Sequence, residues 1–355
     1  MKNKNLILLC AVTLIVIIAA AISSSLRSPR EDIEKPILFP ELANRVNDVS
    51  KISIQGPENT VSLQENNGKW FISSADNYPA AFDKVRQTVL NMSALKLEEK
   101  KTDNPDYYTR LGVEDPSSKE ASSHLVTLSD AIGNTLASVI IGKARQSSGS
   151  RPGLYVRKSG DAQSLLVEGI MDVSSDTADW FDRQLFDIPS EEMQEVVIQY
   201  ADGNTFEIYK ETREQPDFKV RNKDDVPSAA KIIVRRIASA LEEMRADGVQ
   251  AAGNFNFTPE ETIKTTFTTF DGLIIESLLA RIDDRAFGLF SASHDPAQAV
   301  MPESDSTDVK ELTEKISEYV DTLNSKLSGW VYEIPVFKYE AMTTNIDDLA
   351  RFPVN

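Results

Sequence analysis

The sequence predicts an α+β protein, in which an N-terminal transmembrane helix is followed by two tandem duplicated modules of antiparallel sheet with packed amphipathic helices. Three observations lead to this fold class. An apolar run lies near the N-terminus, strand-like patterns with turn signals follow it, and the order of those patterns repeats about 145 residues later. We expect an anchor helix over residues 1–26, a stalk over 27–40, a first module over 41–189, a second module over 190–340 and a C-terminal tail over 341–355.

The apolar run extends from Leu6 to Ile22, and Thr13 is its one polar interruption. As a helix it would reach about 26 Å, the short end of the length that crosses a bilayer. Two lysines precede it, as they do in a cleaved signal peptide, and residues 19–21 are small enough for a cleavage site. A signal peptide has a shorter apolar core, so we favour an uncleaved signal anchor whose transmembrane span ends are Leu6 and Ile22.

The export signal also sets the expected location. A short basic tail ahead of a first apolar segment places the N-terminus in the cytoplasm, although the Lys and Arg counts on the two sides of the run nearly tie. We therefore expect a single-pass protein of the bacterial inner membrane with its ectodomain in the periplasm.

Charge and cysteine content exclude some kinds of partner and site. The chain of 355 residues has a formal net charge of −17, and its basic N-terminal segment makes the remainder still more acidic. Such a surface repels phosphate backbones, which excludes nucleic acid as a partner. The single cysteine, Cys10, lies in the apolar run, so the ectodomain has neither an intrachain disulfide nor a cysteine-based zinc site.

The internal repeat is the most informative pattern after the anchor. Residues 52–63 are typical of a β-hairpin, and residues 196–208 show the same order, with the turn signal Asp202-Gly203 between the two strands. Residues 186–189 (Phe-Asp-Ile-Pro) match residues 332–335 (Tyr-Glu-Ile-Pro) at nearly the same offset. Other matched pairs lie between these, including Trp70-Phe71 with Asp217-Phe218, and residues 126–130 with 266–270. The steady spacing predicts tandem modules that meet near Pro189.

Each module is also predicted to hold an amphipathic helix on its sheet. Pro79 and Pro227 are the expected helix starts, because the first turn of a helix does not need the N–H group that proline lacks. Spacings of three and four residues place apolar side chains on one face of each helix. These side chains are Phe82, Val85, Val89 and Met92 in the first helix, and Ile233, Ile237, Leu241 and Met244 in the second.

The C-terminal part adds one more amphipathic helix, over residues 309–323, before a last strand at Trp330. The pattern weakens after Val336, which predicts a tail.

The chain carries no compact catalytic, cofactor-binding or metal-binding motif, so we expect no such site and no cofactor. The Gly142-Lys pair lacks the residues that a phosphate-binding loop requires on both sides, and Gly142 is expected to end a strand. His124 has Ser122, Ser123 and Asp130 near it in sequence, but no Gly-x-Ser-x-Gly elbow accompanies them. We interpret His124 as a surface histidine on an edge strand.

Other polar and aromatic motifs have structural interpretations. Adjacent acids such as Glu242-Glu243 point in different directions and do not face each other across a cleft, as glycosidase chemistry requires. Residues 103–106 (Asp-Asn-Pro-Asp) lack the rest of a calcium loop and are interpreted as a turn. Trp70, Trp180 and Trp330 are expected in the core, where large aromatic side chains bury most area, and not on a sugar-stacking platform.

Six short motifs in fixed order give the chain a family resemblance. They are Asn67-Gly-Lys-Trp70, Ile140-Ile-Gly-Lys143, Tyr155-Val-Arg157, Trp180-Phe-Asp-Arg183, Asp187-Ile-Pro189 and Gly329-Trp-Val-Tyr-Glu-Ile-Pro335. Together, over residues 38–350, they resemble the bacterial DUF4340 family. The resemblance implies a membrane-anchored protein of the kind often associated with ABC-type transport systems of gliding motility. The family brings no established activity, so it implies no catalytic residues.

These observations lead to an expected function and two alternatives. The expected function is a membrane-anchored, periplasmic, non-enzymatic accessory subunit of an ABC-type transport or motility system, whose duplicated ectodomain makes protein–protein contacts. Its expected partner is an inner-membrane ABC-type permease or an associated envelope protein. The first alternative is a periplasmic module that binds glycan or another polymer, and it needs an exposed aromatic cluster. The second alternative is a hydrolase that uses acidic residues or His124.

Overall fold

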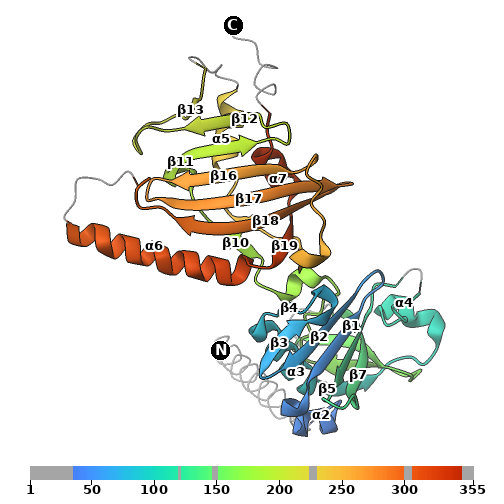
Figure 1. Cartoon of the computed structure of the whole chain (residues 1–355). Coiled ribbons are helices and arrows are strands. Elements are labelled where there is room, and N and C mark those ends of the chain that lie inside the picture. The colour runs from blue at the N-terminus through green and yellow to red at the C-terminus, as the bar shows by residue number, and fades with distance from the viewer. Residues whose placement is uncertain (1–34, 119–120, 146–150, 224–229, 300–305, 346–355) are drawn as a thin grey trace, which may run out of the picture.

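A computed structural model describes residues 35–118, 121–145, 151–223, 230–299 and 306–345 (Figure 1). The predicted anchor, with span ends at Leu6 and Ile22, lies outside these residues. None of the helices within the described ranges combines the length and the apolar character that crossing a bilayer requires. The described chain forms two bodies, each built on a large antiparallel sheet with a few helices, which confirms the α+β class at this level.

The first body is built on a nine-stranded sheet in the order β4-β3-β2-β1-β6-β7-β8-β9-β5. Its strands are β1 (Lys51–Gln55), β2 (Thr60–Asn66), β3 (Lys69–Ile72), β4 (Tyr78–Pro79), β5 (Lys96–Lys100), β6 (His124–Ser129), β7 (Thr135–Ala144), β8 (Gly153–Lys158) and β9 (Ser164–Glu168). Its helices are α2 (Pro40–Asn44), α3 (Phe82–Ser93) and α4 (Tyr108–Leu111), with short 3-10 turns η1 (Val46–Asp48), η2 (Ser73–Ala75), η3 (Pro105–Tyr107) and η4 (Thr177–Trp180).

The second body is built on an eight-stranded sheet in the order β13-β12-β11-β16-β17-β18-β19-β15. Its strands are β11 (Met193–Gln199), β12 (Thr205–Tyr209), β13 (Lys219–Val220), β15 (Gly248–Ala251), β16 (Ile263–Thr269), β17 (Leu273–Ile282), β18 (Arg285–His294) and β19 (Trp330–Ile334). Its helices are α5 (Lys231–Ala238), α6 (Ser306–Leu327) and α7 (Val336–Met342), with 3-10 turns η5 (Ser190–Glu192) and η6 (Ala252–Asn254). A separate two-stranded ladder joins β10 (Gln184–Phe186) to β14 (Met244–Arg245).

Both predicted hairpins are confirmed. In the first, Ile52 lies opposite Leu63, and in the second Val196 lies opposite Ile208. The second turn is stabilised by Asp202, whose Oδ1 accepts a hydrogen bond from the Asn204 backbone at 2.9 Å. Gly203 has a φ of +87°, a conformation that residues with a Cβ rarely adopt.

The first predicted helix forms, but two details were wrong. Pro79 does not open it, because Tyr78 and Pro79 pair with β3 as strand β4, and α3 begins at Phe82. The side chains of Val85 and Met92 are buried as predicted, whereas Phe82 is 57% exposed. Phe82 is the first residue of α3, so it lies at the end of the apolar face and outside the core in which its helical spacing placed it.

The second predicted helix is shorter than its apolar spacing indicated. Helix α5 ends at Ala238, and Leu241 and Met244 are buried beyond it. Met244 lies in β14 and pairs with Phe186 of β10, so this residue of the predicted helix face belongs to a strand instead. Pro227, the predicted start, lies outside the described residues.

The C-terminal elements were predicted in part. Helix α6 forms, and Ile316 and Leu323 of its predicted face are buried. The tail predicted after Val336 instead starts with α7, whose Met342 is fully buried. Its backbone carbonyl accepts a hydrogen bond from Thr265 Oγ1 of β16 at 2.6 Å, which ties α7 to the second sheet.

A short covering segment, residues 105–113, packs on the outer face of the first sheet. Tyr108 and Val113 of this segment bury Ile140 of β7, and Arg157 of β8 lies 4.6 Å from the Tyr108 ring. Gly142 of β7 makes this packing possible, because a Cβ there would lie 2.5 Å from the Leu111 carbonyl oxygen. The prediction that Gly142 ends a strand was wrong, because Gly142 lies inside β7, two residues before the strand ends at Ala144.

The two bodies meet at an aromatic group. The Tyr78 ring of the first body lies edge-on to Trp330 at 4.8 Å and to Phe181 at 5.2 Å. Burial raises the pKa of both Tyr78 and Tyr332, so the two hydroxyls stay protonated. Tyr332 donates to the Lys326 carbonyl at 2.7 Å, which leaves Tyr78 to donate to the Tyr332 hydroxyl at 3.2 Å.

We predict that Gly142→Ala destabilises the protein by about 1–3 kcal/mol, because the new methyl group would press against backbone atoms that cannot rotate away. Gly253→Ala is the matched control, since a Cβ there meets nothing within 4 Å and the residue has no positive φ. Thermal unfolding of both variants checks this, and equal melting temperatures would contradict it.

A second prediction concerns the aromatic group. Tyr332→Phe removes the hydroxyl that links Tyr78 to the Lys326 carbonyl and should cost about 1–3 kcal/mol through unpaired buried groups. Tyr107→Phe removes an exposed hydroxyl and should leave stability unchanged. Chemical denaturation of the two variants is the measurement, and a Tyr332→Phe variant as stable as the parent would show that this bond is not needed.

Candidate interaction surfaces

The structure does not bring together the Ser, His and Asp residues considered for hydrolysis. His124 begins β6, which lies between β1 and β7, so the edge-strand interpretation was wrong. Burial lowers the pKa of His124, which favours its neutral form. Asp130 lies just beyond the other end of β6, about 20 Å along a strand of this length. Ser123 donates to the Glu114 carbonyl, at 2.5 Å, and not to the histidine.

The other candidate motifs have structural roles in the described chain. Asn104 caps η3 by accepting a hydrogen bond from the Asp106 backbone at 3.1 Å, which confirms the turn interpretation. Trp180 is fully buried, and Trp70 and Trp330 pack against the core with part of each side chain exposed. Within the ranges the structure describes, no three His, Cys, Asp or Glu side chains gather as metal ligands would.

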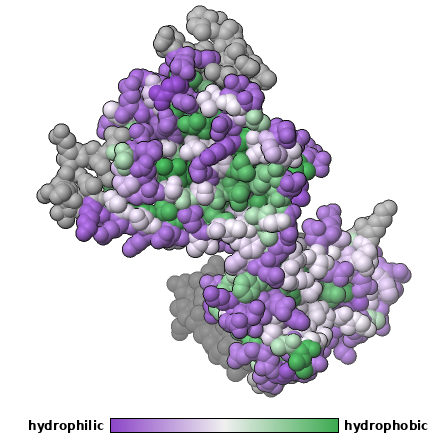
Figure 2. Space-filling model, in the orientation of Figure 1, coloured by the Kyte–Doolittle hydropathy of each residue, from purple (hydrophilic) through white to green (hydrophobic). Residues whose placement is uncertain are grey.

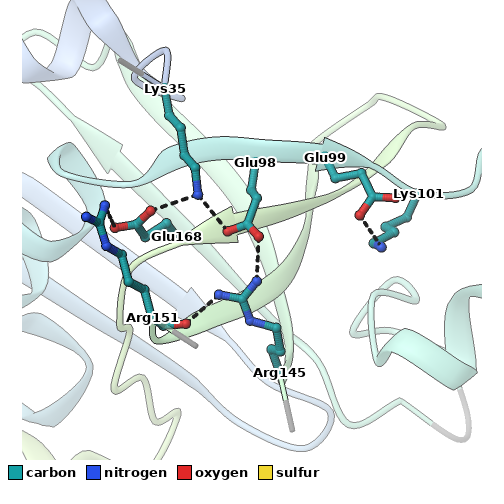
Figure 3. A network of polar contacts seen from close by, with 7 residues as sticks. All are labelled: Lys35, Glu98, Glu99, Lys101, Arg145, Arg151 and Glu168. Carbon is teal, nitrogen blue, oxygen red and sulfur yellow. Dashed lines mark hydrogen bonds and ion pairs between the residues drawn. The ribbon is translucent and has the colours of Figure 1, made fainter. Parts of the chain in front are cut away.

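The first surface of interest is the place where the chain joins the first sheet. Lys35 is the first described residue, and its ammonium group contacts Glu98 at 3.0 Å and Glu168 at 2.9 Å (Figure 3). These carboxylates lie on the paired strands β5 and β9. Arg145 completes the network with a 2.6 Å contact to Glu98, and Arg151 contacts Glu168 at 3.1 Å.

Backbone pairing supports the same junction. The Leu38 amide donates to the Leu95 carbonyl and the Leu97 amide donates to the Pro36 carbonyl, both at 2.8 Å. The Leu38 side chain is buried. Residues 36–38, which the sequence assigned to a stalk, therefore extend the edge of the first sheet beside β5.

Charge coupling holds the junction in its ionised form. Hydrogen bonds to Glu168 and Glu98 raise the pKa of Lys35. Arg145 and then Lys35 lower the pKa of Glu98, and Lys35 lowers the pKa of Glu168. The pKa values of Glu98 and Glu168 are lower in the folded state than in the unfolded state. The ionised carboxylates therefore stabilise the fold fully above the ordinary carboxyl pKa, and this stabilisation is lost as the pH falls through their pKa values in the folded state.

The second surface is the outer face of the second sheet, defined here by Ile274, Leu278 and Leu289. Leu278 of β17 lies opposite Leu289 of β18, and all three side chains are only partly buried. On the inner face of the same strands, Ile275, Leu279 and Phe290 lie in the core, and both α6 and α7 contact β18. Apolar residues gather over β16–β18 on the side seen in Figure 2.

This outer face is bounded by polar groups and adjoins a cavity. Lys264 and Glu276 form an ion pair at 2.5 Å on the same face, and both line a cavity of about 450 Å³ with Leu278 and Leu289. Asn324 of α6 forms the far side of the cavity. Its amide donates to the Ala292 carbonyl at 2.8 Å and accepts from the Ala292 amide at 3.0 Å, so a side chain takes the place of a neighbouring strand.

Sequence reasoning missed this face, although a signal was present. Residues 273–282 (Leu-Ile-Ile-Glu-Ser-Leu-Leu-Ala-Arg-Ile) are apolar on both alternating sets of positions. A strand with one solvated face alternates more strictly, and near-continuous apolar runs are typical of strands covered on both faces. The apolar run thus indicated that the outer face of the second sheet, like that of the first, is suited to contact with another segment or protein.

We predict that Lys35→Glu speeds amide exchange at Leu38 and Leu97, because the new carboxylate would repel Glu98 and Glu168 and loosen the edge pairing. Lys51→Glu makes the same charge change on an exposed strand position and should leave these amides unchanged. Hydrogen–deuterium exchange of the two variants measures the effect. Unaltered protection at Leu38 in Lys35→Glu would mean that backbone pairing alone holds the junction.

Comparison with known proteins identifies a family. The profile described as "Domain of unknown function (DUF4340)" matches residues 70–267, from β3 of the first sheet to β16 of the second. No curated protein matches the chain, and no solved structure matches it. The matched region spans more than half of the chain and includes the covering segment and the boundary between the bodies. The chain belongs to the DUF4340 family.

Proposed function

We propose that this protein is a membrane-anchored, periplasmic, non-enzymatic accessory subunit of an ABC-type transport or motility system. Its ectodomain consists of two copies of one α+β module and makes protein–protein contacts, foremost with an inner-membrane permease or an associated envelope protein. The anchor is the apolar run from Leu6 to Ile22, and the second sheet presents the contact surface. The observation that carries the proposal is one apolar position that is covered in the first body, at Ile140, and only partly covered in the second, at Leu278.

The strand orders support the two-copy organisation. The run β3-β2-β1-β6-β7-β8-β9-β5 of the first sheet has the same pattern of neighbours as β13-β12-β11-β16-β17-β18-β19-β15 of the second. Registers agree at the hairpin ends, since Gln55 pairs with Thr60 and Gln199 pairs with Thr205. Chance would have to reproduce the order of eight strands, that is, seven neighbouring pairs, so a duplication is the simpler account.

The same registers relate the two outer faces residue by residue. Gln55 pairs across to Leu125, which pairs with Ile140. Gln199 pairs across to Lys264, which pairs with Leu278. Leu278 of the second sheet therefore corresponds to Ile140 of the first. On the next strand, Leu289 lies opposite Leu278, and Arg157 lies opposite Ile140.

The contrast between these equivalent positions is the basis for a docking surface. Ile140 is 1% exposed because Tyr108 and Val113 of the covering segment lie on it. Leu278 is only partly buried, although Asn324 of α6 borders the same face and Phe255 lies 5.0 Å from Phe287 further along it. Partly exposed apolar side chains that lie side by side on a sheet, as Leu278 and Leu289 do, are suited to a protein–protein contact. A short helical segment with an aromatic residue, like residues 105–113, is the kind of partner element that the face suits.

The alternatives find less support in the described chain. A glycan module needs an exposed aromatic platform, whereas Trp180 and Phe287 are buried and Phe255, which packs on Phe257 and Phe287 at 4.5 and 5.0 Å, is only partly exposed. A hydrolase based on His124 needs a carboxylate partner, and Asp130 is instead bound to Asn134 and Arg45.

We predict that Leu278→Glu in the full-length chain abolishes co-purification of its membrane partner from detergent extracts, because a charge would be buried in the contact. Ile132→Glu, on a turn of the first body where the side chain is 86% exposed, is the control and should retain the partner. Mass spectrometry of the purified material identifies what is recovered. Recovery of the parent chain alone, or equal recovery with both variants, would refute the proposed contact.

A further inference from the structure

A buried lysine in the second body lacks an anionic partner. Lys210 follows β12 directly, and only 7% of the residue is exposed. Its backbone amide donates to the Gln194 carbonyl at 2.8 Å. Among the described residues, its ammonium group makes no hydrogen bond or ion pair, and its one contact of electrostatic kind is the Phe218 ring at 4.6 Å. A lysine with so little exposed surface usually has an anionic partner, whereas the side chain of Lys210 instead lines a cavity.

The ammonium group borders a cavity of about 410 Å³ in which basic side chains gather. Arg213 lines it and is paired with Glu192 at 2.6 Å, and Arg235 lines it and is paired with Asp217 at 2.8 Å. Arg236 also lines it and, within the described part of the chain, its guanidinium has no partner. In a chain with a net charge of −17, this concentration of positive charge is unusual. The volume is sufficient for a small ligand.

The remaining lining limits the charge that the cavity can accept. Glu191 and Glu214 lie at the exposed rim, and the C-terminal end of α5 contributes a partial negative charge. These groups oppose a doubly charged phosphate more strongly than a singly charged ligand. Water screens the exposed rim acids, whereas the buried Lys210 is screened much less. Phe218 and Pro216 supply apolar surface beside the lysine.

We propose that this cavity binds a carboxylate. Lys210 is the principal cation, Arg236 supplies a second donor from the rim, and Phe218 packs on the apolar part of the ligand. Two sources present this chemistry, a free organic acid and the C-terminal carboxylate of a peptide. The site lies near the sheet edge formed by β12 and β13, away from the outer face that carries Leu278, so it does not depend on the proposed accessory role.

The test uses the full-length chain in detergent and ligand-observed NMR titrations. The probes are acetate for a free organic acid, N-acetylphenylalanine for a peptide C-terminus, the amide of N-acetylphenylalanine, and inorganic phosphate. We expect one of the two carboxylates to bind saturably, and that carboxylate identifies the source. The amide should not bind, because it lacks the charge, and it also reports any uptake of the probe by the micelle.

Two variants assign the binding to this cavity. Lys210→Met keeps the buried stem and removes the charge, and it should raise the dissociation constant at least about tenfold. Arg236→Gln changes an exposed residue, so it should fold normally and weaken binding about threefold. Lys51→Met, at an exposed position in the first sheet, is the matched control and should bind like the parent.

Each other result would overturn the proposal. Saturable binding that both variants at positions 210 and 236 retain would place the ligand elsewhere. Phosphate binding more tightly than either carboxylate would refute the ligand class. No saturable binding of acetate or N-acetylphenylalanine to the parent chain would mean that a rim acid or solvent satisfies Lys210. If Lys210→Met fails to fold, Arg236→Gln decides the question.

Discussion

The organisation of this protein depends on the need to cover apolar sheet faces. A strand that is apolar at both alternating sets of positions presents hydrophobic surface on both sides, and each side must be removed from water. In the first body, helix α3 packs on one side of the sheet and residues 105–113 pack on part of the other. Gly142 lets that segment approach the backbone of β7. In the second body the inner face is covered and the outer face stays partly open, and this contrast is the basis of the proposed partner surface.

The junction between the bodies shows how a boundary in sequence differs from a boundary in space. The β10 strand precedes the predicted boundary at Pro189, yet it pairs with β14, and Phe186 packs edge-on to Phe290 at 5.3 Å. Tyr78, Trp330 and Tyr332 add shared aromatic packing. One buried cluster thus extends through both bodies, so their relative placement is held by apolar contacts and hydrogen bonds.

Charge is distributed unevenly over an acidic chain. Exposed ion pairs contribute little singly, but the contacts around Lys35 form a network at the point where the chain enters the first sheet. Lys210 is the opposite case, a largely buried lysine that contacts an aromatic ring and, among the described residues, forms no ion pair. The first arrangement fixes a chain segment, and the second is the basis of the proposed carboxylate site.

The sequence by itself determined the antiparallel hairpins, the amphipathic helices α3 and α6, and the family, because periodicity and turn chemistry are local properties. It did not determine that Pro79 pairs as a strand, that α5 stops at Ala238 or that α7 packs beneath the second sheet. In each case a distant strand or hydrogen bond outweighed local preference. Leu278 and Lys210 show the same limit. Whether an apolar or charged side chain is covered or paired depends on segments remote in sequence, and only the tertiary structure brings those segments together.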